Sequence, residues 1–207
     1  MEINNLNDAI AFANLSITDQ SIKIISTIRE NYVISNSYHY IYNPNTCLWD
    51  EANDNMLMSC VSDLLLTISN KIQSFKNYFK NNEIVKLLKN LDKTTYMKDI
   101  LLRKICLLED PEFMKNLNNL KFHLPIKNNS KISLIDGSIS PRLKEDRFTF
   151  TCDVYPTENI SHASKFFSQV CVDKHDREYL QTLLGYALSG TNDARNFFIF
   201  YGSGSNS

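Results

Sequence analysis

Residues 57–79 read LMSCVSDLLLTISNKIQSFKNYF, and this stretch decides the fold class. Its apolar side chains recur at steps of three and four residues, which places them on one face of an α-helix. Asp54 precedes the stretch and is positioned to cap the start of the helix. We therefore predict one long helix whose apolar face packs into the core of a mainly helical protein. The stripe has eight members: Leu57, Val61, Leu64, Leu65, Ile68, Ile72, Phe75 and Phe79.

Shorter helices are predicted on both sides of this one, because apolar residues recur there at similar spacing. Thr18 and Asp19 offer capping oxygens between the first two helices. Asp110 is placed to cap a later helix, with Pro111 in its first turn, and Gly190 is a natural stop for the last helix. The predicted helices span residues 6–15, 21–32, 84–91, 97–108, 112–120, 163–172 and 179–188.

Strand patterns occupy two other parts of the chain. Residues 38–49 place aromatic and β-branched residues around an Asn-Pro-Asn turn, which predicts a hairpin that covers the core with Trp49. Residues 124–142 alternate around turns at Asn129 and Gly137, which predicts a small β-meander, and residues 148–154 add another strand. The predicted fold is mainly α with a small β-meander insert, an α+β class.

These patterns divide the chain into five consecutive segments. An N-terminal pair of helices with an aromatic hairpin is followed by a helical region, the β-meander, a second helical region and a final strand with a glycine-rich turn. The predicted boundaries are 1–50, 51–122, 123–155, 156–190 and 191–207.

Composition places the chain among ordinary soluble globular proteins, with 43% hydrophobic and 22% charged residues. A formal net charge of −1 gives no overall attraction to nucleic acid, so such a contact needs a local patch. No apolar run reaches the roughly 20 residues that cross a bilayer, and a signal-peptide pattern is absent from the sequence. Five cysteines without a Cys-x-x-Cys pair predict reduced thiols. We expect an intracellular protein, cytoplasmic or nuclear, that is neither secreted nor membrane-bound.

The sequence predicts neither a catalytic site nor a metal site. Cys171 and His175 lie four residues apart, but no second pair at metal-ligand spacing accompanies them. His39, His123 and His162 have no partner in the sequence pattern that would make a catalytic pair. A nucleophile with both a base and an acid partner does not emerge.

Residues 71–104 are locally basic, with nine basic residues against three acidic ones and a local net charge of +6. Tyr78, Phe79 and Tyr96 are interleaved with them. This pattern suits a DNA single strand, because basic side chains track phosphates and aromatic rings stack on bases. The alternative, a solvated helix face with its rings in the core, is the more common cause of such a pattern. Phe79 falls on the apolar stripe, which favours the core for that ring. The DNA-binding candidates are Lys71, Lys76, Lys80, Lys86, Lys89, Lys93, Lys98, Arg103 and Lys104.

The last eleven residues begin as a phosphate-binding loop does. Residues 197–201 are apolar throughout, which predicts a strand in the middle of a covered sheet, and glycines follow it directly. The loop pattern G-x-x-x-x-G-K-[ST] cradles phosphates with backbone N–H groups, and its lysine would come after Ser207. A Gly-Ser cloning linker has the same composition, but it has no reason to follow an apolar strand. The nucleotide-binding candidates are Gly202, Ser203, Gly204, Ser205, Asn206 and Ser207.

Ordered sequence blocks extend this pattern upstream: Leu124-Pro125, Asn128, Leu134, Gly137, Pro141, Phe148-Thr149, Leu180-Gln181, Leu184-Gly185-Tyr186, Leu188, Gly190, Phe197-Phe198, Tyr201-Gly202, Gly204 and Asn206. The order resembles the region before the motor in superfamily-3 helicases of poxviruses, giant viruses and phages. Asn129 stands where that family has Gly, and Asn also accepts left-handed turns. Ser207 stands where the family has the loop's second signature Gly.

The resemblance implies a helical collar in front of a hexameric, ATP-driven DNA helicase, in which a primase module lies further upstream in poxvirus-like members. It implies that residues 197–201 form the first strand of an AAA+-like α/β motor. ATP and Mg²⁺ then belong to the whole protein, whereas this chain, without the loop lysine, is expected to hold no cofactor and to hydrolyse no ATP. The implied partners are single-stranded DNA and further copies of the chain. Two alternatives are a stand-alone single-strand-binding module and a purely structural oligomerisation domain.

Overall fold

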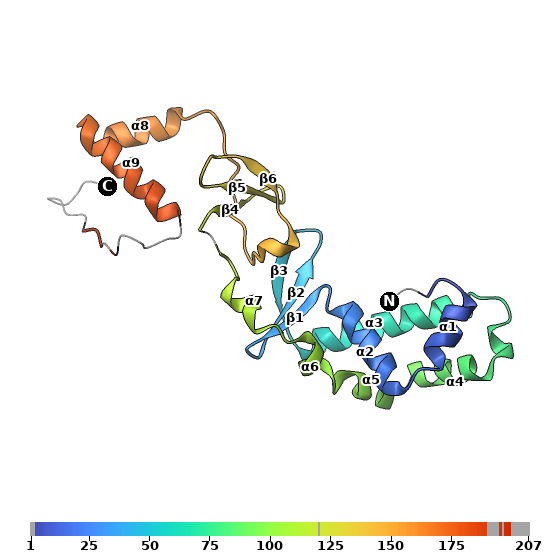
Figure 1. Cartoon of the computed structure of the whole chain (residues 1–207). Helices are drawn as coiled ribbons and strands as arrows, with labels where there is room; N and C mark the ends of the chain where they lie inside the picture. Colours follow the sequence, from blue (N-terminus) through green and yellow to red (C-terminus); the bar gives the residue numbers. More distant parts are fainter. Residues whose placement is uncertain (1–2, 120, 190–194, 196, 200–207) are drawn as a thin grey trace. The chain divides into compact units, whose positions relative to one another are not determined.

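The computed structural model of the protein describes residues 3–119, 121–189, 195 and 197–199. The chain divides into two units (Figure 1). The first unit comprises Met1–Asn118 and Leu143–Phe150, and the second comprises Asn119–Arg142 and Thr151–Ser207. Within the part that the structure describes, no helix has the length and apolar character needed to cross a membrane.

Two short helices begin the first unit, as predicted. Helix α1 (Leu6–Ala13) starts with a capping box, in which Asn5 and Asp8 each accept from the other's backbone N–H. Helix α2 (Ile17–Ile28) is capped by Ser16, whose Oγ lies 3.1 Å from the backbone nitrogen of Asp19. The predicted cap at Thr18 or Asp19 is therefore wrong, because both residues already lie inside the first turn.

The predicted hairpin is part of a three-stranded antiparallel sheet. Strands β2 (Tyr38–Asn43) and β3 (Leu48–Ala52) form the hairpin, and β1 (Tyr32–Ser35) pairs with the other edge of β2. No strand was predicted here: the predicted helix ended at Tyr32, the first residue of β1, and residues 33–35 were assigned to no element. The four residues of β1 are all buried, which is typical of a strand covered on both faces and conceals the period-two pattern.

Helix α3 (Asp54–Gln73) is the centre of the main core. Figure 1 shows it among the other helices of the first unit, and its Leu57, Val61 and Ile72 are fully buried. Asn53, not Asp54, is the N-cap, with its Oδ1 3.1 Å from the nitrogen of Met56. The helix stops before Phe79, because Ser74 closes it and Asn77 takes a left-handed conformation with φ of +64°.

Among the described residues of the first unit, four further α-helices follow α3. Helix α4 (Asn82–Leu91) agrees with its prediction, whereas the predicted helix over 97–108 is two: α5 (Thr94–Leu101) and α6 (Lys104–Leu108). The break turns the chain so that Leu108 is buried and the nitrogen of Asp110 bonds to Ile34 O at 2.8 Å. Helix α7 (Pro111–Lys115) has the predicted Asp110 cap and Pro111 start, but it ends well before residue 120.

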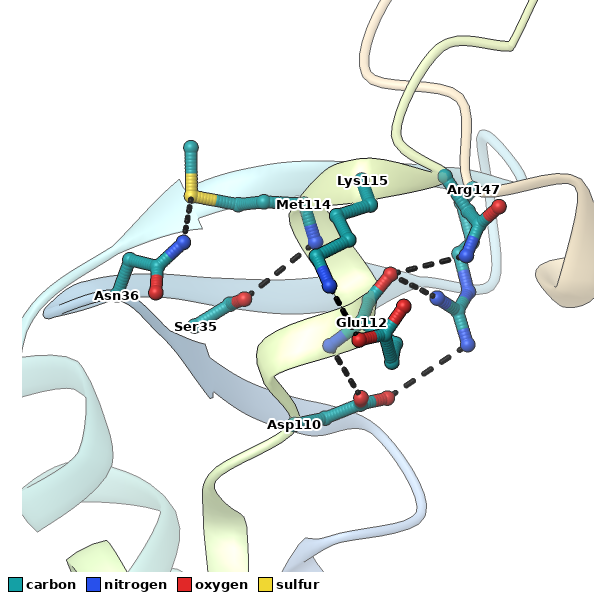
Figure 2. Close-up of polar contacts among 8 residues, drawn as sticks. Ser35, Asn36, Asp110, Glu112, Met114, Lys115 and Arg147 are labelled. Atoms are coloured by element: carbon teal, nitrogen blue, oxygen red, sulfur yellow. Dashed lines mark hydrogen bonds and ion pairs between the residues drawn. The ribbon is translucent and has the colours of Figure 1, made fainter.

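A second, smaller core lies between the sheet and α7. Trp49 packs there with Val33, Tyr40 and Phe113, and its Nε1 donates to Lys144 O at 2.9 Å. It is buried as expected, but in this second cluster and not against the main core. Figure 2 shows how Arg147 secures α7: its guanidinium donates to Glu112 O at 3.1 Å and lies 3.6 Å from the Asp110 carboxylate. The Arg147 guanidinium also lies 5.0 Å from the centroid of the Phe113 ring.

The second unit contains the predicted β-meander. Strands β4 (His123–Ile126), β5 (Ser130–Ser133) and β6 (Ile139–Pro141) pair antiparallel in that order. Asn129 has φ of +52°, so the position where the resembling family has Gly does take the left-handed conformation. The structure has no strand at 148–154, where one was predicted. Residues 148–150 instead belong to the first unit, where Phe148 O accepts from the nitrogen of Trp49.

Helices α8 (Ser161–Val170) and α9 (Lys174–Leu188) complete the described elements of the second unit and confirm the two predicted helices. The predicted stop at Gly190 lies outside the described residues. Residues 197–199, the described part of the predicted apolar strand, lie in no strand and have exposed side chains. A strand that is apolar on both faces needs neighbouring strands, and no strand of the described chain pairs with them. The α+β class is as predicted.

Candidate nucleic-acid interface

The basic stretch, residues 71–104, forms a continuous part of the first unit, from the end of α3 to the start of α6. Six lysines in residues 71–93, here called the lysine segment, have exposed side chains. Among the described residues, none of the six forms an ion pair with a carboxylate. Their charges are therefore available to a phosphate backbone. The six are Lys71, Lys76, Lys80, Lys86, Lys89 and Lys93.

Helix α4 explains why these lysines stay exposed. Ile84, Leu87 and Leu91 lie at helical spacing and are buried against α1, α3 and α5, so the helix has one fixed inner face. Lys86 and Lys89 fall between these positions and point away from the core. Asn81 fixes the start of the helix, because its Oδ1 accepts from the backbone nitrogens of residues 83 and 84 at 3.0 and 3.1 Å.

The last three predicted DNA-binding residues have different surroundings. Lys104 is ion-paired with Asp54, so its charge is already partly neutralised. Arg103 donates to Thr18 Oγ1 at 3.0 Å, which ties the start of α6 to α2. Lys98 is exposed on α5. Arg103 and Lys104 are therefore less available to a phosphate than the lysine segment is, whereas Lys98 is as exposed as the six lysines.

The three interleaved aromatic residues separate by burial. Phe79, expected in the core, has 62% of its surface exposed. Tyr78 is half-buried and packs against the main core. Tyr96 has only 3% of its surface exposed and donates to Gln20 Oε1 at 2.6 Å, and burial raises its pKa to about 12. Tyr96 is therefore a core residue, and Phe79 alone of the three is presented to solvent.

A polar cluster that the sequence did not predict joins the sheet to α3 and α6. His39 Nδ1 lies 2.7 Å from the hydroxyl of Tyr32, and that hydroxyl donates to Asn53 O at 3.0 Å. On the other side of the ring, His39 Nε2 lies 3.9 Å from Asp54, whose carboxylate also binds Lys104. The hydrogen bond from Lys104 lowers the pKa of the Asp54 carboxyl. These contacts join β1, β2, α3 and α6.

An apolar cleft of about 820 Å³ lies between α8, α9 and residues 197–199 in the second unit. Phe166, Val170, Tyr179 and Leu184 line it, and all four are exposed. The sequence predicted both helices from the same apolar spacing, but spacing gives no information on whether a partner covers a face.

Two further sets of residues stand out in the sequence: the nucleotide-binding candidates and the pair Cys171 and His175. The six nucleotide-binding candidates, residues 202–207, lie outside the described residues. Cys171 ends α8 and His175 lies in the first turn of α9. Across the described residues, no group of three His, Cys, Asp or Glu side chains is placed to hold a metal ion.

Comparison with known proteins relates the chain to a viral helicase. It is 28% identical over 130 residues to a protein of Acanthamoeba polyphaga mimivirus named "Putative helicase". The matched region covers 59% of this chain and 13% of that much longer protein. No family model matches the chain.

Proposed function

We propose that this chain is a helical region of a viral helicase that engages single-stranded DNA through the lysine segment. The observation that carries the proposal is the run of six exposed lysines that have no carboxylate partner within the described part of the chain, which is related to a viral helicase. Residues 71–93 include only Glu83 and Asp92 as acids, so this part of an otherwise near-neutral chain attracts phosphate.

The resemblance to superfamily-3 helicases supports a more specific proposal. In it, the chain precedes an ATPase motor, takes part in a hexamer and guides DNA toward that motor, while ATP and Mg²⁺ bind at the loop that begins at Gly202. The whole protein would then be an ATP-dependent DNA helicase acting in replication.

DNA binding can be tested by fluorescence anisotropy with a labelled oligothymidylate of roughly 20 nucleotides, longer than the sites of typical single-strand-binding domains. We expect the affinity of the wild-type chain to fall steeply between roughly 50 and 200 mM salt. The double variant Lys80→Gln/Lys86→Gln should bind more weakly. Its slope of log affinity against log salt should be shallower by about 0.7 for each phosphate that the two lysines neutralise in the wild-type complex.

A matched control removes the same charge elsewhere. Lys23 on α2 and Lys165 on α8 are also exposed, and Lys23→Gln/Lys165→Gln should leave both affinity and slope near the wild-type values. Absence of binding at low salt, or an equal reduction in affinity in both double variants, would contradict the proposal.

Subunit assembly is a second candidate function, and the apolar cleft favours it. Exposed apolar side chains gathered on two adjacent helices are typical of surfaces that a protein partner covers. If a second copy covers this face, sedimentation should show association that increases with concentration, and Leu184→Asp should abolish it. Leu66→Asp, at an exposed position on α3, is the control. A chain that stays monomeric at high concentration would contradict this function.

A further inference from the structure

Backbone hydrogen bonds define the short turn that connects α3 to α4. Asn77 takes the left-handed conformation, and a 3₁₀ turn, η1 (Tyr78–Lys80), follows it. The nitrogen of Lys80 bonds to Asn77 O at 3.0 Å, and the nitrogen of Asn81 bonds to Tyr78 O at 3.2 Å. Asn81 then caps α4. These bonds fix the backbone conformation of the turn.

Within this turn, Tyr78 is an anchor and Phe79 is an exposed tip. The Tyr78 ring packs against the main core, and the Phe79 ring meets it edge to face, with centroids 5.9 Å apart and planes at 82°. This contact holds the Phe79 ring on one side while 62% of the residue's surface faces solvent. Exposing so much of an aromatic ring forgoes the free energy that its burial would contribute.

The surroundings of Phe79 favour nucleic acid over a protein partner. Lys76 and Lys80 flank it in sequence, and the other lysines of the lysine segment lie on the adjoining elements. Among residues 67–101, all described, Phe79 is the one large hydrophobic side chain with an exposed surface. Protein interfaces have an apolar patch depleted of lysine at their centre. A single ring among lysines instead matches single-strand binding, in which charges track phosphates and a ring stacks on a base.

We propose that Phe79 is a base-stacking residue, which takes the face of one unpaired base while the neighbouring lysines hold the phosphates on either side of it. This inference rests on the proposed function, because it requires the lysine segment to bind single-stranded DNA. Stacking is independent of sequence, because every base has a π-face, and it needs an unpaired base, so it separates single strands from duplex.

The test compares Phe79→Ala with wild type on the labelled oligothymidylate over a series of salt concentrations. We expect affinity to fall about tenfold, the size typical of one base–aromatic stack. The slope against salt should not change, because every lysine that faces a phosphate is still present. Affinity for a blunt duplex of the same length should also be unchanged. Tyr38→Ala, which removes an equally exposed aromatic residue from β2, is the matched control and should match wild type.

A direct readout comes from Phe79→Trp. The only native tryptophan, Trp49, is buried in the second core, so fluorescence quenching on adding oligonucleotide reports the new ring. We expect quenching by the single strand and none by the duplex. Wild-type binding with full affinity in Phe79→Ala would overturn the stacking role alone. Absence of wild-type binding would overturn the proposed function together with it. Circular dichroism checks that both variants keep the wild-type helix content.

Discussion

Helices α3 and α9 have similar sequence patterns and opposite environments. Each has apolar residues at helical spacing, and each is capped by a polar side chain, Asn53 for α3 and Asp173 for α9. Helix α3 packs against α2, α4 and α5 and buries five residues of its apolar stripe, whereas no residue of α9 is buried. The five are Leu57, Val61, Leu65, Ile68 and Ile72. Apolar periodicity therefore predicts a helix and its apolar face, whereas the burial of that face depends on which elements pack against it.

The largest expected effect is the loss of stability on truncating a buried leucine of α3. Leu57 on α3 has 0% of its surface exposed, and Leu57→Ala should lower the free energy of unfolding by about 2–5 kcal/mol, because it removes buried apolar surface and leaves a cavity. Leu66 lies on the same helix but is 60% exposed, so Leu66→Ala should cost less than about 0.5 kcal/mol. Urea unfolding of both variants checks this, and equal destabilisation would contradict the assignment of the inner face.

A smaller effect is expected at the buried hydrogen bond between α5 and α2. Tyr96→Phe leaves Gln20 Oε1 without its donor in the core, which should cost about 1–3 kcal/mol. Tyr179→Phe removes the hydroxyl of an exposed residue of α9 and should leave the unfolding curve unchanged. If both substitutions had the same effect, the hydrogen bond between Tyr96 and Gln20 would not form in solution.

The same tyrosine predicts a pH dependence. Burial raises the pKa of Tyr96 from 10.0 to about 12, so the folded state binds its proton more tightly than the unfolded state does. The stability linked to this proton is complete below pH 10 and disappears as pH rises from 10 through 12. Unfolding measured across this range should show the decline, and Tyr96→Phe should make it shallower. A decline of equal steepness in the variant would assign it to other groups, such as buried Tyr32.

The two aspartate caps extend the comparison to helix ends. Asp110 accepts from the nitrogen of Glu112 and pairs with Arg147, so Asp110→Ala should cost the first unit about 1 kcal/mol. Asp173 caps α9, and Asp173→Ala should leave the unfolding of the first unit unchanged. Thermal unfolding followed by the fluorescence of Trp49, which lies in the first unit, distinguishes the two. A shift of the Trp49 transition in Asp173→Ala would contradict this expectation.

Local chemistry made much of this fold predictable. The inner face of α3, the cap at Asp110 and the turns of the β-meander follow from spacing and from residue types with fixed conformational preferences. The errors have non-local causes. Strand β1 was missed because burial on both faces erases alternation, and the break between α5 and α6 carries no glycine or proline to mark it.

The exposure of the basic residues follows from the sequence, whereas the burial of the aromatic residues between them does not. Exposed lysines could be expected from the basic run alone. Phe79 was placed in the core by extending the α3 stripe past Asn77, whose left-handed conformation turns the chain out of the helix. Tyr96 is buried because Gln20, far away in sequence, offers it an acceptor. The spacing of apolar residues near Phe79 and Tyr96 therefore predicts neither the exposure of the first nor the burial of the second.

The smallest effect on stability is expected at Leu184 of α9. Leu184 lines the apolar cleft of α9 and is 43% exposed, so Leu184→Ala should change the free energy of unfolding by less than about 0.5 kcal/mol, although the same substitution at Leu57 is severe. Urea unfolding at low protein concentration, where association is suppressed, measures this value. A decrease of about 2 kcal/mol or more would mean that the cleft is closed around Leu184 in solution. Helix α9 would then resemble α3, and the contrast between the two helices would disappear.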